Sequence, residues 1–254
     1  MKKLLFACFS LLILGTSCKK SGAGSGSGGT AFMTLTSGST WNYKETNLNN
    51  STSADYTLSA TSKDSLVNGR SYRVFTFNRN GANSSDYYNI SGGTYYQYTT
   101  LSPVLPRFEF RYLVDNAPNW SDPLQQTIGN DVLSQIPNIP SGTEASITAS
   151  IKNTNDASVT TLAVNNINYT GVKKIVTKIE SIKAIIEFNN IPVPNTIQAT
   201  ENEIISYYAP KVGLIKRETK LKIAIQLNIP GQTIPPVDVS NINSKIELMS
   251  SKIL

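Results

Sequence analysis

The chain has 254 residues, of which 39% are hydrophobic and 16% charged, and it contains two cysteines and no histidine. Without histidine there is no Ser-His-Asp or Cys-His catalysis, no HExxH zinc site and no 2-His-1-carboxylate iron site, and two cysteines are too few for a four-cysteine zinc site or an iron–sulfur cluster. The formal net charge of +6 falls to +2 for residues 31–254 once Lys2, Lys3, Lys19 and Lys20 are set aside, and no run of Lys and Arg exceeds two residues, so we expect no nucleic-acid partner.

The first eighteen residues have the pattern of an export signal. Two lysines precede an apolar run over Leu4–Leu14, which is shorter than the ~20 residues a membrane-spanning helix needs. Small residues at 15–17 then lead to Cys18. This order resembles a bacterial lipoprotein signal, which implies a signal peptide over 1–17, cleavage before Cys18 and lipid on its thiol. The alternative is an ordinary secretory signal in which the cysteine occurs by chance.

Residues 19–30 read KKSGAGSGSGGT and predict a flexible tether, so that 18–30 form the lipidated cysteine and its linker. A Gly/Ser-rich chain of this length spans ~19 Å on average. Cys8 leaves with the signal peptide, so the mature chain has no second thiol and no disulfide. Lys19, with no acidic cluster after it, favours an outer-membrane lipoprotein that faces the periplasm.

Residues 31–254 predict an antiparallel β domain, because they are rich in Thr, Ser, Asn, Tyr, Val and Ile. Asn68-Gly69 is typical of a hairpin turn, and Ser91–Thr94 joins two tyrosine-rich strands in a second hairpin. Residues 107–112 alternate Arg or Glu with aromatic residues, as a strand does. The fold class that we expect is all-β: a single curved antiparallel sheet or half-barrel with long hairpins and at most one or two short helices.

Two segments leave helix and strand both open. The apolar residues of 172–188 fit helical spacing, but their many β-branched side chains favour a strand. Asp122-Pro123 has the form of a helix N-cap followed by proline at the first helical position, which predicts a short helix there.

Several features recur along the chain. The order Trp, Val-Asn-turn-Tyr, Tyr-Tyr begins at Trp41 and again at Trp120, which a duplicated β module with halves 31–119 and 120–254 would explain. Chance recurrence in a chain rich in Tyr and Asn is the alternative. Three Ile-Pro segments are here called the proline tips: two follow a predicted strand and the third precedes one, and proline stops strand pairing there. They are Ile136–Pro140, Ile191-Pro192 and Ile229-Pro230.

The segment Tyr207–Lys216, YYAPKVGLIK, resembles a motif of uncharacterised Bacteroidota-type envelope lipoproteins, which pair it with an early Trp-x-Tyr such as Trp41–Tyr43. The resemblance implies a strongly curved antiparallel sheet, similar to the half-barrel of the lipoprotein carriers LolA and LolB, and implies no established activity. Lys211 stands where glycine is commoner, which argues against a turn that needs a positive φ at this position.

Two surfaces are candidates for ligand or partner binding. One is an aromatic platform for a glycan or an apolar ligand, formed by Tyr87, Tyr88, Tyr95, Tyr96 and Tyr98, and the alternative is ordinary cross-strand packing. The other is an apolar patch at the proline tips, and the alternative is that the tips pack on one another. Its residues are Ile191, Pro192, Val193, Ile229, Pro230 and Ile234, with Ile136, Ile139 and Val237.

We therefore expect a lipid-anchored envelope protein that binds or scaffolds and is not an enzyme, with no cofactor and no metal. Its partners would be the membrane, through the N-terminal lipid, and an envelope protein, a glycan or a lipid. A first alternative is a carrier or sensor of lipid with a concave, aliphatic-lined sheet. A second is a glycan-processing enzyme that uses Glu109, Asp115 and Asp122 beside Trp120.

Overall fold

The computed structural model describes residues 31–100, 106–129, 142–228 and 235–254, and within these ranges the chain forms strands and no helix. The strands are β1 (Thr40–Asn47), β2 (Ser53–Val67), β3 (Arg70–Arg79), β4 (Ala82–Ser91), β5 (Thr94–Thr99), β6 (Phe108–Val114), β7 (Asn119–Ile128), β8 (Thr143–Asp156), β9 (Thr161–Val164), β10 (Ile167–Thr170), β11 (Lys173–Phe188), β12 (Ile191–Pro192), β13 (Asn195–Ala209), β14 (Gly213–Leu227) and β15 (Val237–Lys252). The described part of the chain holds no helix that could cross a membrane.

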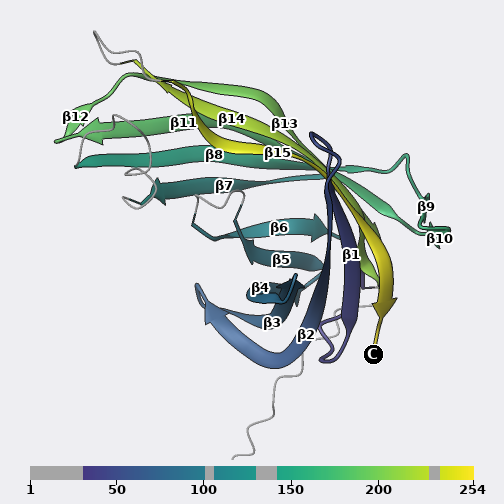
Figure 1. The fold of residues 1–254 in the computed structure, drawn as a ribbon. Helices are drawn as coiled ribbons and strands as arrows, with labels where there is room; N and C mark the ends of the chain where they lie inside the picture. Colours follow the sequence, from purple (N-terminus) through teal and green to yellow (C-terminus); the bar gives the residue numbers. More distant parts are fainter. Residues whose placement is uncertain (1–30, 101–105, 130–141, 229–234) are drawn as a thin grey trace, which may run out of the picture.

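All strands except β9 and β10 belong to one curved antiparallel sheet (Figure 1), which confirms the predicted fold class. Its order is β6-β5-β4-β3-β2-β1-β15-β14-β13-β11-β8-β7, with β12 paired to the end of β11. Because β1 pairs with β15, the first and last strands of the chain meet in the middle of the sheet. The two edge strands, β6 and β7, are consecutive in sequence and curve back toward each other.

The boundary that we predict between halves divides the continuous strand order of the large sheet into six strands, β1–β6, and six others, β7, β8, β11, β13, β14 and β15; the short strands β9, β10 and β12 also belong to the second half. Trp41 and Trp120 are each the second residue of the first strand of their half. The two asparagine turns also lie between the second and third strands. The Tyr-Tyr pairs do not correspond, since Tyr95-Tyr96 lies in the fifth strand and Tyr207-Tyr208 in the fourth. The duplication therefore stays a prediction.

Local turn chemistry agrees with the sequence. Asn68 and Gly69 both have positive φ, 50° and 78°, between β2 and β3, and Gly92 and Gly93 do the same between β4 and β5. Residues 173–188 form the strand β11, as their β-branched side chains predicted. The turn between β13 and β14 corrects one expectation, because Lys211 adopts a φ of 64° there without being glycine.

The prediction of a short helix after Asp122-Pro123 is wrong, because both residues lie inside the strand β7. The Asp122 carboxylate accepts a hydrogen bond from the Arg111 side chain and does not cap a helix. β7 is an edge strand, paired only with β8, so proline can occupy it without removing a ladder bond to a second neighbour.

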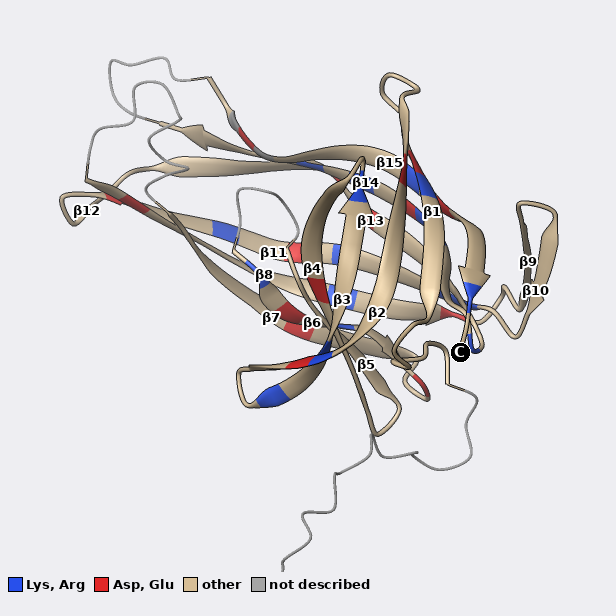
Figure 2. Cartoon of the chain, turned by 60° about the horizontal axis from the view of Figure 1, so that its bottom comes forward, with Lys and Arg blue, Asp and Glu red and all other residues tan. Residues whose placement is uncertain are grey.

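The interior holds two large apolar clusters. The first contains Trp41, Phe75, Tyr95, Leu113 and Ile215, all at most 1% exposed, and fills the strongly curved end of the sheet. The second draws its buried residues from β7, β8, β11 and β14, and consists of aliphatic residues such as Ile147, Ile179 and Ile223. Charged residues are distributed over many strands and not collected on one element (Figure 2), which is typical of solvated strand faces.

Candidate functional site

The concave face of the sheet holds a cavity of about 250 Å³. Strands β1–β6 and β13–β15 contribute to it, together with Met33 from the segment before β1. Its most frequent side chains are aromatic and form what we call the aromatic wall, namely Trp41, Tyr43, Tyr56, Phe77, Tyr88, Tyr112 and Tyr208. The four charged side chains that line it are Glu45, Arg79, Asp86 and Arg217.

The aromatic wall is built from ring contacts between neighbouring strands. Tyr43 stacks on Tyr56 with ring centroids 5.1 Å apart, and Tyr56 lies 4.7 Å from Phe77. On the opposite side, the Tyr112 ring lies 6.1 Å from Tyr88 and 5.4 Å from Tyr208. Such pairs are worth about 0.5–1.5 kcal/mol beyond the area that they bury, so these contacts position the rings firmly.

Arg217 on β14 places a guanidinium among these rings without a carboxylate partner. Its Nε donates to Ser206 Oγ at 3.1 Å, and its Nη2 lies 3.5 Å from the Tyr208 hydroxyl. Burial alone would lower the pKa of Arg217, but the surrounding tyrosines, led by Tyr208, raise it above its ordinary value. The side chain is therefore a fixed positive charge that uses only part of its hydrogen-bonding capacity.

Asp86 on β4 brings an unpaired carboxylate to the same cavity. Among the residues that the structure describes, none forms an ion pair or hydrogen bond with its side chain. Burial raises the pKa of Asp86, and Arg107 and Arg217 lower it in part from a distance. Glu45 and Arg79, by contrast, form an ion pair with each other. The two uncompensated charges of the cavity are thus Asp86 and Arg217.

Asp86→Asn is expected to make the folded protein more stable at pH 7, by on the order of 1 kcal/mol, because it removes a desolvated charge that has no partner. A carboxyl whose folded pKa is raised favours folding below its unfolded pKa of about 4, and this contribution is lost as the pH rises through the folded pKa. Urea unfolding at pH 7 and at pH 3.5 measures the difference, which should vanish at the lower pH. The exposed Asp55→Asn is the control, and an equal gain from it would contradict the argument.

The five tyrosines that we expected to form a platform are divided between the two faces of the sheet. Tyr88 and Tyr95 point to the concave side, where Tyr95 is 1% exposed and its hydroxyl accepts a hydrogen bond from the Phe32 amide. The other three lie on the opposite face, because residues alternate along a strand and Tyr87 pairs directly with Tyr98. There the guanidinium of Arg70 lies 3.6 Å from the ring centroid of Tyr96. Of the five, only Tyr88 lines the cavity.

The proline tips are described in part. Ile191 is 66% exposed and Pro192 pairs with Glu187 at the end of β11, whereas Val193 packs against the aliphatic cluster. Ile136, Ile139, Ile229, Pro230 and Ile234 lie outside the described residues, as does the side chain of Val237. Cys18, the lipidation site that we expect, also lies outside them. The apolar patch at the tips therefore stays a prediction.

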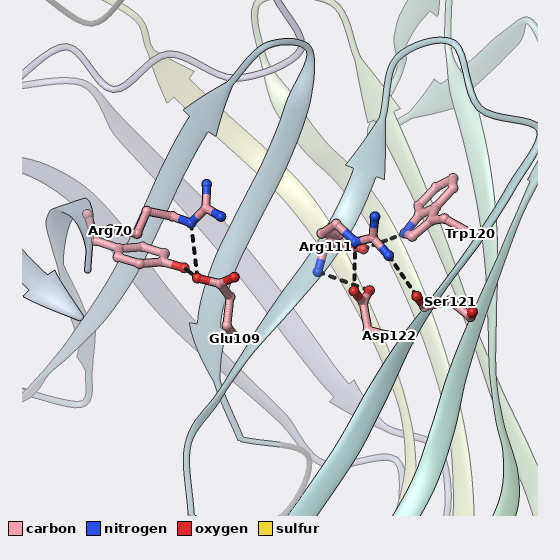
Figure 3. A network of polar contacts seen from close by, with 7 residues as sticks. Arg70, Glu109, Arg111, Trp120, Ser121 and Asp122 are labelled. Atoms are coloured by element: carbon pink, nitrogen blue, oxygen red, sulfur yellow. Dashed lines mark hydrogen bonds and ion pairs between the residues drawn. The ribbon is translucent and has the colours of Figure 1, made fainter. Parts of the chain in front are cut away.

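The three carboxylates of the enzyme hypothesis each contact a cation, and Figure 3 shows two of them, Glu109 and Asp122. Asp122 contacts Arg111 at 2.6 Å, and Glu109 contacts Arg70 at 3.1 Å and accepts a hydrogen bond from the Tyr72 hydroxyl. Asp115 lies 3.3 Å from the Lys173 ammonium. The Trp120 indole donates to the Arg111 carbonyl oxygen at 2.8 Å, so these side chains join the edge strands β6 and β7.

Sequence reasoning missed Asp86 and Arg217, although both carry a local signal. Arg217 shares its face of β14 with Leu221 and Ile223, which are 2% and 6% exposed, so a charge stands on an otherwise buried face. Asp86 lies two residues before Tyr88 and therefore on the same side of β4. The part of the chain that the structure describes contains no cluster of three or more acidic, cysteine or histidine side chains that suits a metal ion.

No protein-family model matches the sequence, and no curated protein matches it. Two solved structures are similar over 88% of this chain and 99% of their own length. One is a "putative lipoprotein" from Parabacteroides distasonis, with a TM-score of 0.47 and 10% identity. The other is a "putative exported protein with YmcC-like fold" from Bacteroides fragilis, with a TM-score of 0.37 and 11% identity. Similarity at this level establishes neither a family nor a function.

Proposed function

We propose that this protein is a lipid-anchored lipoprotein of the bacterial cell envelope whose β domain binds a small ligand in the aromatic-walled cavity, without catalysing a reaction. The observation that carries the binding function is the pair of unpaired charges, Asp86 and Arg217, that line one cavity with seven aromatic side chains. A half-buried charge without a partner costs stability, and a ligand group of opposite charge would compensate it.

The anchor is proposed from the sequence around Cys18 and from where the described domain begins. The Ala31 carbonyl oxygen accepts a hydrogen bond from Lys211 in the turn between β13 and β14, at the opposite end of β14 from Leu227. A strand of fifteen residues is about 46 Å long, so the far end of β14 stands well away from the tether. This arrangement suits a domain that is held on a membrane at its N-terminal end, and the proposal of an outer-membrane protein facing the periplasm rests on Lys19.

Cys18→Ser is expected to release the protein from the membrane fraction, because one residue carries the whole anchor. Cells grown with an alkyne-bearing fatty acid should label the wild-type protein and not the variant. Label on the variant, or membrane retention without label on either form, would contradict the anchor. Protease treatment of intact cells tests the orientation, and loss of the domain would place it on the cell surface.

Ligand binding is tested on the mature chain, residues 18–254, carrying Cys18→Ser so that it is soluble. The sequence has two tryptophans, so Trp120→Phe leaves Trp41, which lines the cavity, as the sole reporter. Anilinonaphthalene sulfonate, an aromatic anion, is expected to change the Trp41 emission at saturation. Thr99→Phe fills the cavity and should abolish the change, while Thr76→Phe on the opposite face of β3 should not. No change in the wild type, or equal effects of both variants, would contradict the proposal.

The observations favour a small ligand over an acyl chain. A lipid carrier requires a concave face lined by aliphatic side chains, but this cavity is lined mainly by aromatic and charged ones. The aliphatic residues of the domain are gathered elsewhere, between β11 and β14, where they pack against each other as core. The proposal therefore names binding, and the carrier and glycan-processing alternatives gain no support from the described residues.

A further inference from the structure

We propose that the ligand of this cavity is a compact amphipathic zwitterion, with an ammonium group at Asp86, a carboxylate or phosphate group at Arg217 and an apolar body against the aromatic wall. The inference rests on the proposed function and adds the chemical class of the ligand. It combines three features of one cavity, namely an unpaired anion, an unpaired cation and a wall of aromatic rings.

The anionic end of the ligand is assigned by Arg217. A guanidinium has five N–H donors in a planar fork, and the structure uses one on Ser206 and directs another at Tyr208. The remaining donors match the paired oxygens of a carboxylate or phosphate, which guanidinium groups bind in a bidentate manner. The other guanidinium of the cavity, Arg79, is already bound to Glu45.

The cationic end is assigned by Asp86, whose two oxygens accept no hydrogen bond from the described residues. A primary ammonium supplies three donors and a positive charge, and so satisfies both the hydrogen bonding and the charge of the carboxylate. The neighbouring ring of Tyr88, two residues along the same face of β4, adds a favourable surface for a cation.

Asp86 and Arg217 reach the cavity from strands that are far apart in the sheet. β4 and β14 are separated in the sheet by β3, β2, β1 and β15, so the two side chains approach the cavity from opposite sides of its curve. They form no ion pair with each other. The rest of the lining consists mainly of rings and of aliphatic residues such as Leu58, Val212 and Leu214, which suits an apolar body that carries two charged ends. A cavity of about 250 Å³ accommodates a ligand of the size of a large amino acid or a lipid headgroup.

The test compares three probes that share one apolar body, by calorimetry on the soluble mature chain. Phenylalanine carries both charges, phenethylamine only the ammonium, and 3-phenylpropionate only the carboxylate. Phenylalanine is expected to bind about tenfold more tightly than either analogue, because each charge-assisted hydrogen bond adds binding free energy. Glycerophosphoethanolamine, tested in parallel, distinguishes a lipid headgroup from a free amino acid as the source of the zwitterion.

Single substitutions test which charged group of the ligand each of the two residues binds. Asp86→Asn should weaken the binding of phenylalanine and phenethylamine about tenfold and leave the affinity for 3-phenylpropionate unchanged. Arg217→Gln should weaken the binding of phenylalanine and 3-phenylpropionate and leave the affinity for phenethylamine unchanged. Asp55→Asn and Lys63→Gln, both exposed, are the charge-matched controls. Arg217→Lys keeps the charge and serves if the glutamine variant does not fold.

The zwitterion is overturned if 3-phenylpropionate or phenethylamine binds as tightly as phenylalanine and glycerophosphoethanolamine does not bind, or if the two variants weaken all probes equally. These outcomes are distinct from failure of the proposed function. If anilinonaphthalene sulfonate still reports on Trp41 in a manner that Thr99→Phe blocks, the cavity binds ligands and only the ligand class is wrong.

Discussion

Raising the pH above 10 is expected to unfold this domain, because several tyrosines of the cavity cannot ionise while it is folded. Burial raises the pKa of Tyr43, Tyr88 and Tyr112 well above the ordinary value of about 10, and neighbouring tyrosines raise those of Tyr43 and Tyr112 further. Burial likewise raises the pKa of Tyr56. In the unfolded chain the same groups ionise near pH 10.

The direction of the pH effect on stability follows from the number of protons that the folded and the unfolded states bind. An acid whose folded pKa is raised contributes its full stability below the unfolded pKa, and that stability is lost as the pH rises toward the folded pKa. Each such tyrosine removes about 1.4 kcal/mol per pH unit above pH 10, so three of them remove about 4 kcal/mol per unit. Since a domain is stable by about 5–15 kcal/mol, unfolding is expected within a few pH units of 10.

Circular dichroism and the ultraviolet absorbance of tyrosinate, recorded together during an alkaline titration, measure this effect. We expect a group of tyrosines to ionise only when the β-sheet signal is lost. Tyr112→Phe keeps the ring but removes one ionising group, so it should move the unfolding midpoint to higher pH. Gradual ionisation of all twelve tyrosines near pH 10 with an intact sheet signal would contradict the burial of the aromatic wall.

Trp41→Ala is expected to destabilise the domain by about 4 kcal/mol, the range typical of a large aromatic residue removed from a core. The Trp41 side chain is 1% exposed, packs 5.7 Å from the Phe75 ring and donates its indole N–H to the Val212 carbonyl oxygen at 2.6 Å. The variant leaves a void and an unpaired carbonyl. It also removes the hydrogen bond between β1 and the turn that joins β13 to β14.

Urea unfolding at pH 7 measures the loss as a lower midpoint. Leu48→Ala is the matched control, because that side chain is 45% exposed and its removal should change the free energy of unfolding by less than about 0.5 kcal/mol. A Trp41→Ala protein as stable as the control would show that the stability of the domain does not depend on this contact.

Local sequence patterns predicted most of the fold because strands and turns depend on neighbouring residues. Asn68-Gly69 predicted a turn from the positive φ of its two residues, and the alternation of residues 107–112 predicted β6. Asp122-Pro123 led to a wrong prediction because its local sequence is compatible with two structures. The same two residues suit a helix start or an edge strand, and the choice was made by Arg111, which binds the carboxylate, and by β8, which pairs with the segment.

The five clustered tyrosines show that local sequence could not predict the candidate site either. Its residues are close in sequence and lie on adjacent strands, as predicted, but their faces depend on register, and Tyr87 opposite Tyr98 places both on the face away from Tyr88. The cavity instead draws one tyrosine from β4 and others from β1, β2, β6 and β13. No local window of sequence contains that set.

The sequence by itself determined that the domain is an antiparallel β-sheet with hairpins at particular glycines and asparagines, because side-chain alternation and backbone preference act over a few residues. It also predicted export and anchoring through Cys18, since such signals are read along the chain. Only the tertiary structure decided that Asp86 and Arg217 share one cavity. Strand order and sheet curvature bring β4 and β14 to opposite sides of that cavity, and neither property is encoded near either residue.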